Sequence, residues 1–180
     1  MRFRTILRRK AIYVSMGIFS FLIGSCAKSP SAGGFQLDYD ETILLDAEDL
    51  AEGGIGKAYE ALLPKLRQYM AQPAAVKELL DNDTPRYAVQ SGVKEFVIYA
   101  PELDETTGNS WGRAAAAFFT IVNDQLAETE YRFFAINGGN DLCGIFLTPA
   151  QAEASREALP NKSDWPYLPK DEHPWYGQHR

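Results

Sequence analysis

Apolar residues recur every three or four positions in two stretches of the chain, the spacing that places them on one face of a helix, and a helix-start motif marks a third stretch. The first stretch covers residues 55–70 and contains Pro64, which predicts a kink or two abutting helices. The second covers residues 111–126 and forms one aromatic and aliphatic stripe. The third follows Thr148, which opens a capping box with proline at the first helical position, and extends to about residue 159. We therefore expect three main helices.

Shorter apolar runs, rich in aromatic and β-branched residues, predict β-strands. Residues 86–90 and 94–99 flank a serine–glycine pair, and residues 131–136 and 142–147 flank a turn of asparagine, glycine and aspartate. Glycine and asparagine adopt the positive φ that a tight reversal requires. Each pair of runs is therefore expected to form an antiparallel hairpin.

Two further segments have weaker signals. Residues 42–45 predict a short strand, and Asp46 with Asp49 predicts the start of a helix, because acidic side chains stabilise the positive end of a helix. Residues 75–80 fit either a short helix or a strand. Because these two segments are ambiguous, the sequence does not fix the number of strands.

Hairpins alternate with helices along the chain, which predicts an α+β fold. We expect a small antiparallel sheet built from hairpins, with helices packed on one face in a two-layer arrangement. A single α+β domain is expected over residues 38–160. A tail rich in proline and aromatic residues, 161–180, follows it.

The first 25 residues have the form of a secretory signal peptide. Residues 1–10 carry five basic residues and no acid, and residues 11–24 form an apolar run. This run is shorter than the roughly 20 residues that a membrane-spanning helix needs. It ends in Leu22-Ile23-Gly24-Ser25-Cys26, which resembles the lipobox of bacterial lipoproteins.

The resemblance implies that the chain is cleaved before Cys26 and that this cysteine is acylated, which anchors the protein to a lipid bilayer. Residues 26–37 are then the lipidated cysteine and a flexible tether. Ala27 and Lys28 stand where many lipoproteins of the inner membrane carry aspartate, so the resemblance favours the periplasmic face of the outer membrane. An ordinary cleaved signal peptide is the alternative.

Charge is distributed unevenly along the chain. The formal net charge is −6, but from Cys26 onward 13 basic residues stand against 24 acidic ones, a balance of −11. Nucleic acid is therefore excluded as a favoured partner, because phosphate binding requires clustered positive charge.

Few residues suit covalent or metal chemistry. His173 and His179 are the only histidines of the sequence and both lie in the tail, which disfavours a histidine-based nucleophilic enzyme. Cys143 lies in an apolar stretch and has no disulfide partner once Cys26 is acylated, so a buried structural thiol is expected. No cofactor or metal ion is predicted, and an enzyme is the less favoured class.

Acidic and aromatic side chains are the candidate contacts for a binding partner. Dense negative charge in segments 38–52 and 102–105 suits a basic protein. The tail holds two of the three tryptophans, and its aromatic rings either pack on the domain or form a recognition surface. The candidate residues are Asp46, Glu48, Asp49, Glu102, Asp104, Glu105, Trp165, Tyr167 and Trp175.

These features favour a protein-binding lipoprotein, most concretely an immunity or inhibitor protein that neutralises a toxin or a cell-wall hydrolase. The expected partners are a basic envelope or toxin protein and, through Cys26, the lipid bilayer. Two alternatives stay open. One is an envelope enzyme that uses paired carboxylates such as Asp104 and Glu105. The other is a structural or assembly lipoprotein that binds peptidoglycan or an outer-membrane complex through its aromatic tail.

Overall fold

The computed structural model describes residues 36–81, 83–103 and 109–179. All of them belong to one compact unit, residues 34–180. The leader and the predicted lipidation site Cys26 lie outside the described residues, as do Asp104 and Glu105.

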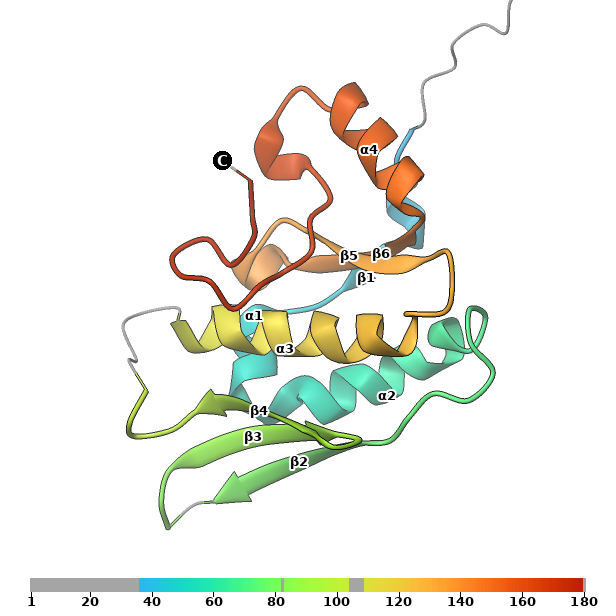
Figure 1. The fold of residues 1–180 in the computed structure, drawn as a ribbon. Helices are drawn as coiled ribbons and strands as arrows, with labels where there is room; N and C mark the ends of the chain where they lie inside the picture. Colours follow the sequence, from blue (N-terminus) through green and yellow to red (C-terminus); the bar gives the residue numbers. More distant parts are fainter. Residues whose placement is uncertain (1–35, 82, 104–108, 180) are drawn as a thin grey trace, which may run out of the picture. The chain divides into compact units, whose positions relative to one another are not determined.

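The described residues contain six strands, which form two antiparallel three-stranded sheets (Figure 1). The first sheet has the order β1-β6-β5, and the second has the order β2-β3-β4. The strands are β1 (Ile43–Leu44), β2 (Val76–Asp81), β3 (Arg86–Ser91), β4 (Lys94–Tyr99), β5 (Arg132–Ile136) and β6 (Cys143–Leu147). Both predicted hairpins are confirmed as β3–β4 and β5–β6. The ambiguous segment 75–80 is strand β2, paired along its length with β3.

The described residues contain four α-helices, of which the last follows the final strand. They are α1 (Ala47–Asp49), α2 (Ile55–Leu66), α3 (Asn109–Gln125) and α4 (Pro149–Ala158). A kinked segment, Leu50–Gly54, joins α1 to α2. Glu52 and Gly53 depart there from helical dihedral angles, and Gly53 takes a φ of 93°, a conformation that favours glycine. Three short 3-10 helices are Tyr39–Glu41, Gly139–Asp141 and Lys162–Asp164. Helix α2 continues through Pro64 as one element and ends at Leu66.

The predicted helix starts have the expected caps. Asp46 accepts hydrogen bonds from the backbone N–H groups of Glu48 and Asp49, 2.9 and 3.4 Å away. The capping box of α4 is complete, because Thr148 and Gln151 each bond the other's backbone N–H. The helix starts predicted at Asp46 and at Thr148 are therefore confirmed.

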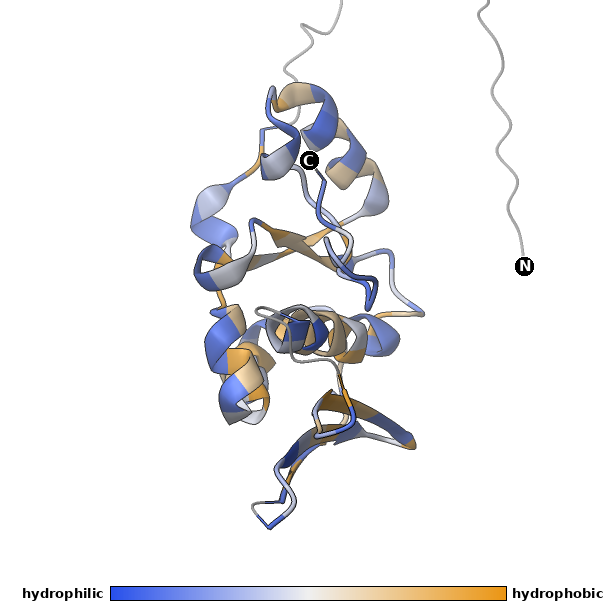
Figure 2. Ribbon diagram, turned by 90° about the vertical axis from the view of Figure 1, so that its left-hand side faces the viewer, coloured by the Kyte–Doolittle hydropathy of each residue, from blue (hydrophilic) through white to orange (hydrophobic). Residues whose placement is uncertain are grey.

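Helix α3 lies between the two sheets and supplies the centre of the core (Figures 1 and 2). Its buried Phe119 stacks on Phe133 of β5 with ring centroids 4.8 Å apart, and Phe133 contacts Phe146 of β6 at 4.6 Å. A smaller cluster on the opposite face of the same sheet packs against α4. The α+β fold with antiparallel sheets and helices packed on their faces is confirmed.

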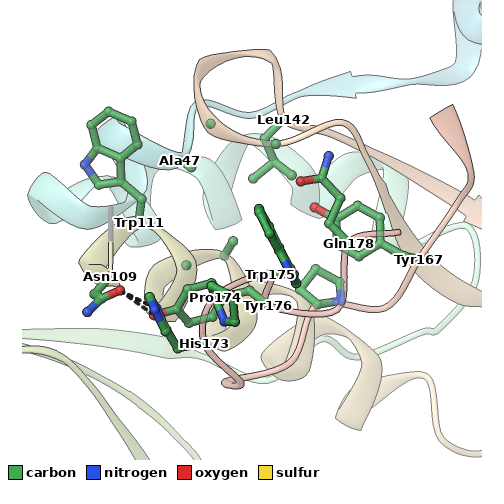
Figure 3. Close-up of a pocket in the computed structure, with 15 residues that line it drawn as sticks. Ala47, Asn109, Trp111, Leu142, Tyr167, His173, Pro174, Trp175, Tyr176 and Gln178 are labelled. Carbon is green, nitrogen blue, oxygen red and sulfur yellow. Dashed lines mark hydrogen bonds between the residues drawn. The ribbon is translucent and has the colours of Figure 1, made fainter. Parts of the chain in front are cut away.

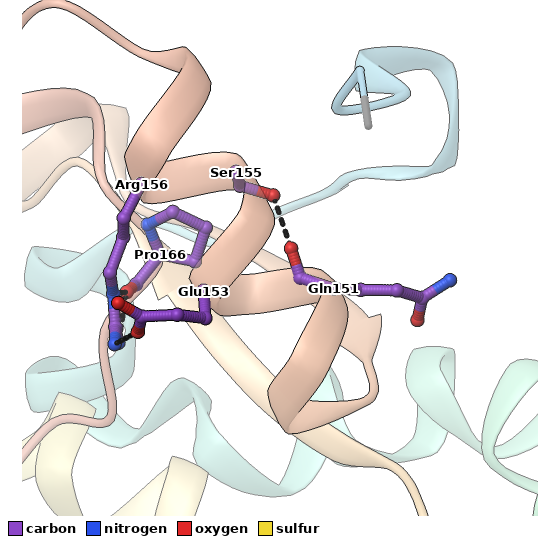
Figure 4. A network of polar contacts seen from close by, with 5 residues as sticks. All are labelled: Gln151, Glu153, Ser155, Arg156 and Pro166. Carbon is purple, nitrogen blue, oxygen red and sulfur yellow. Dashed lines mark hydrogen bonds and ion pairs between the residues drawn. The ribbon is translucent and has the colours of Figure 1, made fainter. Parts of the chain in front are cut away.

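Residues 165–179 pass beside strand β5 at the edge of the first sheet and are called the strap below. Tyr167 pairs with Ala135 of β5 through two backbone hydrogen bonds of 2.8 and 2.9 Å. Helix α4 holds the strap through Arg156, whose guanidinium donates to the carbonyl of Pro166 and bonds Glu153 (Figure 4). The strap is thus an integral part of the fold.

Candidate functional site

Two of the acidic residues predicted at the first helix, Asp46 and Asp49, lie beside an open groove. Asp46, Asp49 and Glu52 line it, and its lining includes strand β1 and the start of α2. Its volume is about 370 Å³. The apolar side chains are Ile43, Leu44, Leu45, Leu50, Ala58 and Ala61, and Lys57 is the one basic residue among the described lining. We call this feature the acidic groove.

The three predicted acids of α1 differ in their partners. Asp46 is committed to capping the helix. Glu48 accepts a hydrogen bond of 3.0 Å from the side-chain amide of Asn140. Asp49 is exposed on the groove, as is Glu52, which the sequence placed in the same acidic segment. Asp49 and Glu52 are therefore the carboxylates best placed to meet a partner.

Strand β1 presents an open edge to this groove. Leu45 donates its N–H to the carbonyl of Leu142, so the Leu45–Leu142 pair is a hydrogen-bonded pair of the ladder. Hydrogen-bonded and non-bonded pairs alternate in an antiparallel ladder, so the N–H and C=O of Leu44 point away from β6. Neither group has a hydrogen-bond partner among the described residues. The Leu44 side chain is 75% exposed.

The opposite edge of the same sheet is closed. The side-chain amide of Asn123 on α3 bonds both the N–H and the C=O of Phe133, at 2.8 and 2.9 Å. Tyr167 occupies the next outward position at Ala135, and its hydroxyl donates to the carbonyl of Asn137 at 2.6 Å. Unpaired edges are sites where another chain can add. In this sheet the open position is at Leu44.

The predicted aromatic residues of the tail have three different environments. Trp165 donates its ring N–H to the carbonyl of Leu159 and packs edge-on against His179, with ring centroids 5.4 Å apart. Tyr167 is 5% exposed and belongs to the core. Trp175 is 48% exposed. Of the three, Trp175 is the one best placed to contact a ligand.

Trp175 lies in a pocket of about 200 Å³ between the strap, the start of α3 and the turn that precedes β6 (Figure 3). We call it the strap pocket. Asn109 is buried at one side, and its Oδ1 lies 2.8 Å from Nδ1 of His173 and 3.3 Å from the hydroxyl of Tyr176. The ring of Tyr176 packs directly on Gly112 of α3, where no side chain would fit. These contacts fix the strap residues that form the wall.

A carboxylate with an unusual environment lies on β2 and was not singled out by the sequence. Oε1 of Glu78 accepts the N–H of Gly56 at 2.9 Å and the hydroxyl of Tyr87 at 2.6 Å. Burial, reinforced by the Glu78 carboxylate, raises the pKa of Tyr87 far above its ordinary value. This bonding joins the second sheet to the start of α2, which is a structural role. Side chains alternate between the two faces of a strand, and Glu78 occupies an inward position of β2. That position is the signal by which the sequence could have indicated it.

The remaining candidates for chemistry are clustered metal ligands, the acids near residue 102 and the thiol of Cys143. In the described parts of the chain, no group of three histidine, cysteine, aspartate or glutamate side chains could hold a metal ion. Glu102 is exposed beyond the end of β4, and its predicted neighbours Asp104 and Glu105 lie outside the described residues. Cys143 is half-buried, and burial together with Asp141 raises the pKa of its thiol. A raised pKa disfavours the reactive thiolate.

Comparison of the chain with protein-family models, with curated proteins and with solved structures finds no match. Among the helices of the described residues, none has the length and apolar character to cross a membrane. The function must therefore be argued from the residues and the geometry.

Proposed function

We propose that the protein is a lipid-anchored binding module on the periplasmic face of the outer membrane that captures a basic protein. Its most concrete form is an immunity or inhibitor protein that occludes a toxin or a cell-wall hydrolase. The resemblance of residues 22–26 to a lipobox supports the location. The formal net charge of −11 from Cys26 onward supports a positively charged partner.

The observation that carries the proposal is the acidic groove beside the open edge at Leu44. Stable protein interfaces place apolar side chains at the centre and polar ones at the rim. Leu44 supplies an exposed apolar centre, and Asp49 and Glu52 supply a negatively charged rim. A basic partner would gain both apolar burial and favourable charge pairing at this place.

The backbone of Leu44 adds a third kind of contact. Its outward N–H and C=O can pair with an extended segment of the partner, a mode in which main-chain hydrogen bonds add to side-chain contacts. The strap and Asn123 close the other edge of the sheet, which leaves β1 as the edge at which a segment can add.

The experiment uses the full-length protein in detergent micelles as bait for envelope extract, at low and at high salt. We expect one stoichiometric cationic protein that dissociates as salt rises, since screening weakens exposed charge pairs. The captured protein is then purified and its affinity is measured against two charge-reversal variants. Asp49→Lys with Glu52→Lys is expected to weaken binding by about tenfold or more.

Glu128→Lys with Glu130→Lys is the matched control, because both residues are exposed acids beyond the end of α3. It changes net charge equally and is expected to retain binding. Leu44→Ser tests the apolar centre without touching the core. A partner held equally by all variants overturns the acidic groove as the binding site. Retention on purified cell wall without a protein partner overturns the inhibitor function and favours the structural alternative.

A further inference from the structure

The strap pocket has a chemistry different from that of the acidic groove. The described residues that line it include no aspartate, glutamate, lysine or arginine. Its polar groups are amides, hydroxyls and an imidazole, and its walls are aromatic rings and small residues. We propose that this pocket binds a neutral saccharide that carries an N-acetylated amino sugar.

The aromatic wall suits the apolar face of a sugar ring. Trp175 is half-exposed at the pocket, between the Asn109–His173 pair on one side and Gln178 on the other (Figure 3). An aromatic face carries partial negative charge that attracts the positively polarised C–H groups of a pyranose. An exposed tryptophan is costly to leave in water, and stacking on a sugar ring removes that surface from solvent.

The polar groups suit the hydroxyls and the acetamido group of such a sugar. The side-chain amide of Gln178 is half-buried and makes no hydrogen bond to another described residue, so both its donor and its acceptor are open. His173 bonds Asn109 through Nδ1, which leaves Nε2 for a ligand. Ala47, Ala115 and Leu142 supply an apolar lining that matches an acetyl methyl group. Ligand sites combine these two features, an apolar lining and a few placed polar groups.

The neutral lining separates this ligand class from the competing ones. The described lining supplies no Lys or Arg side chain to pair with a phosphate or carboxylate and no Asp or Glu side chain to pair with a cation, so its polar groups favour a neutral polar ligand. The pocket volume of about 200 Å³ accommodates one sugar ring. The remainder of an oligosaccharide would extend past Trp175 into solvent.

The backbone beside Trp175 is held in an unusual conformation. Tyr176 has a φ of 47° and Gly177 a φ of 89°, and Asn137, next to the pocket, has a φ of 59°. Left-handed non-glycine residues persist where the surrounding contacts fix them, and they cluster at ligand sites. Tyr176 is held by its contacts with Gly112 and Asn109, so the backbone next to Trp175 is fixed before any ligand binds. A preformed wall lowers the entropy cost of binding.

The test is calorimetric titration of the full-length protein in detergent micelles with tri-N-acetylchitotriose. We expect saturable binding, and about tenfold weaker binding of cellotriose, which lacks the acetamido groups. Trp175→Ala is expected to weaken binding by about tenfold, Trp175→Phe to retain most of it, and Gln178→Ala to weaken it several-fold. Leu168→Ala is the matched control, because Leu168 is exposed on the same strap and does not line the pocket.

Thermal melting shows whether each variant is folded. If Trp175→Ala does not fold, the affinity of Gln178→Ala decides the test. Absence of saturable binding to the folded wild type overturns the proposal. So does unchanged affinity of Trp175→Ala, which would place the saccharide elsewhere. Equal affinity for cellotriose overturns the assignment to N-acetylated sugars.

Discussion

Gly144 shows at the scale of one residue how tightly the core is packed. A Cβ atom at this position would lie 2.0 Å from the ring of Phe133, which is itself fully buried between Phe119 and Phe146. Gly144→Ala is therefore expected to lower the free energy of unfolding by about 1–3 kcal/mol, measured by urea denaturation.

Gly138→Ala is the control for that substitution. Gly138 has an extended backbone, with φ −166°, and a Cβ there would meet only the flexible side chain of Gln178. Its unfolding free energy is expected to stay within about 0.5 kcal/mol of the wild type. Equal effects of the two substitutions would contradict the packing argument.

Tyr167 provides a pH-dependent prediction, because burial raises its pKa to about 12. Its pKa in the unfolded chain is about 10. Between these two values the unfolded state releases the phenolic proton and the native state keeps it. The contribution of the protonated Tyr167 to the free energy of unfolding is therefore complete below pH 10 and is lost as pH rises towards 12.

Tyr167→Phe removes both this titration and the hydrogen bond to the carbonyl of Asn137. At pH 8 the variant is expected to be less stable by about 1 kcal/mol. The difference from the wild type is expected to shrink between pH 10 and 11, measured by urea denaturation at each pH. Tyr39→Phe, at a residue that is 54% exposed, is the control. A constant difference across this range would contradict the assigned pKa.

At the scale of elements, Asn123 joins α3 to β5 by completing the edge of the sheet. Its amide satisfies both backbone groups of Phe133, and no other strand lies at that edge among the described residues. Asn123→Ala is expected to lower the free energy of unfolding by about 1–3 kcal/mol, because it leaves two partly buried backbone groups without partners.

Asn161→Ala is the matched control, since Asn161 is exposed and bonds only the nearby Asp164 among the described residues. It is expected to unfold at the same urea concentration as the wild type. Hydrogen exchange at the amide of Phe133 gives a second measurement. Slow exchange that persists in Asn123→Ala would show that this edge is protected by something else.

Elements with local signals could be predicted from the sequence. The capping box at Thr148, the cap at Asp46 and the turn between β5 and β6 depend on residues a few positions apart, and all three are present. Residues 75–80 could not be assigned locally, because their pairing with β3 is what makes them a strand. The division of the strands into two sheets likewise depends on long-range packing against α3.

The candidate sites also combine features set by neighbouring residues with features set by long-range contacts. The acids of the groove are neighbours in sequence, so Asp46 and Asp49 could be predicted together. The open edge at Leu44 follows from its register with β6, about 100 residues away in the chain. The strap pocket brings Asn109 to His173 and Tyr176 across 64 and 67 positions. Charge density is visible in sequence, whereas an edge or a pocket wall exists only after folding.

At the scale of the whole molecule, the proposed anchor and the charge of the domain act in opposite directions. The region from Cys26 onward has a balance of −11, and bacterial membrane surfaces are anionic, so electrostatics alone repels the domain from the bilayer. Attachment would then depend on the acyl chains, each buried methylene of which contributes about 0.8 kcal/mol.

Cys26→Ser is therefore expected to release the protein from the membrane fraction, at low salt as well as at high salt, because the net negative charge from residue 26 onward gives no attraction to an anionic bilayer. Cys143→Ser is the matched control, since it removes the other cysteine of the sequence and leaves the predicted anchor. That variant is expected to stay with the membranes and to incorporate labelled palmitate, whereas Cys26→Ser incorporates none. Retention of Cys26→Ser at both salt concentrations would mean that residues 11–24 stay uncleaved as the anchor. Release of both variants would mean an ordinary cleaved signal peptide and a free periplasmic protein.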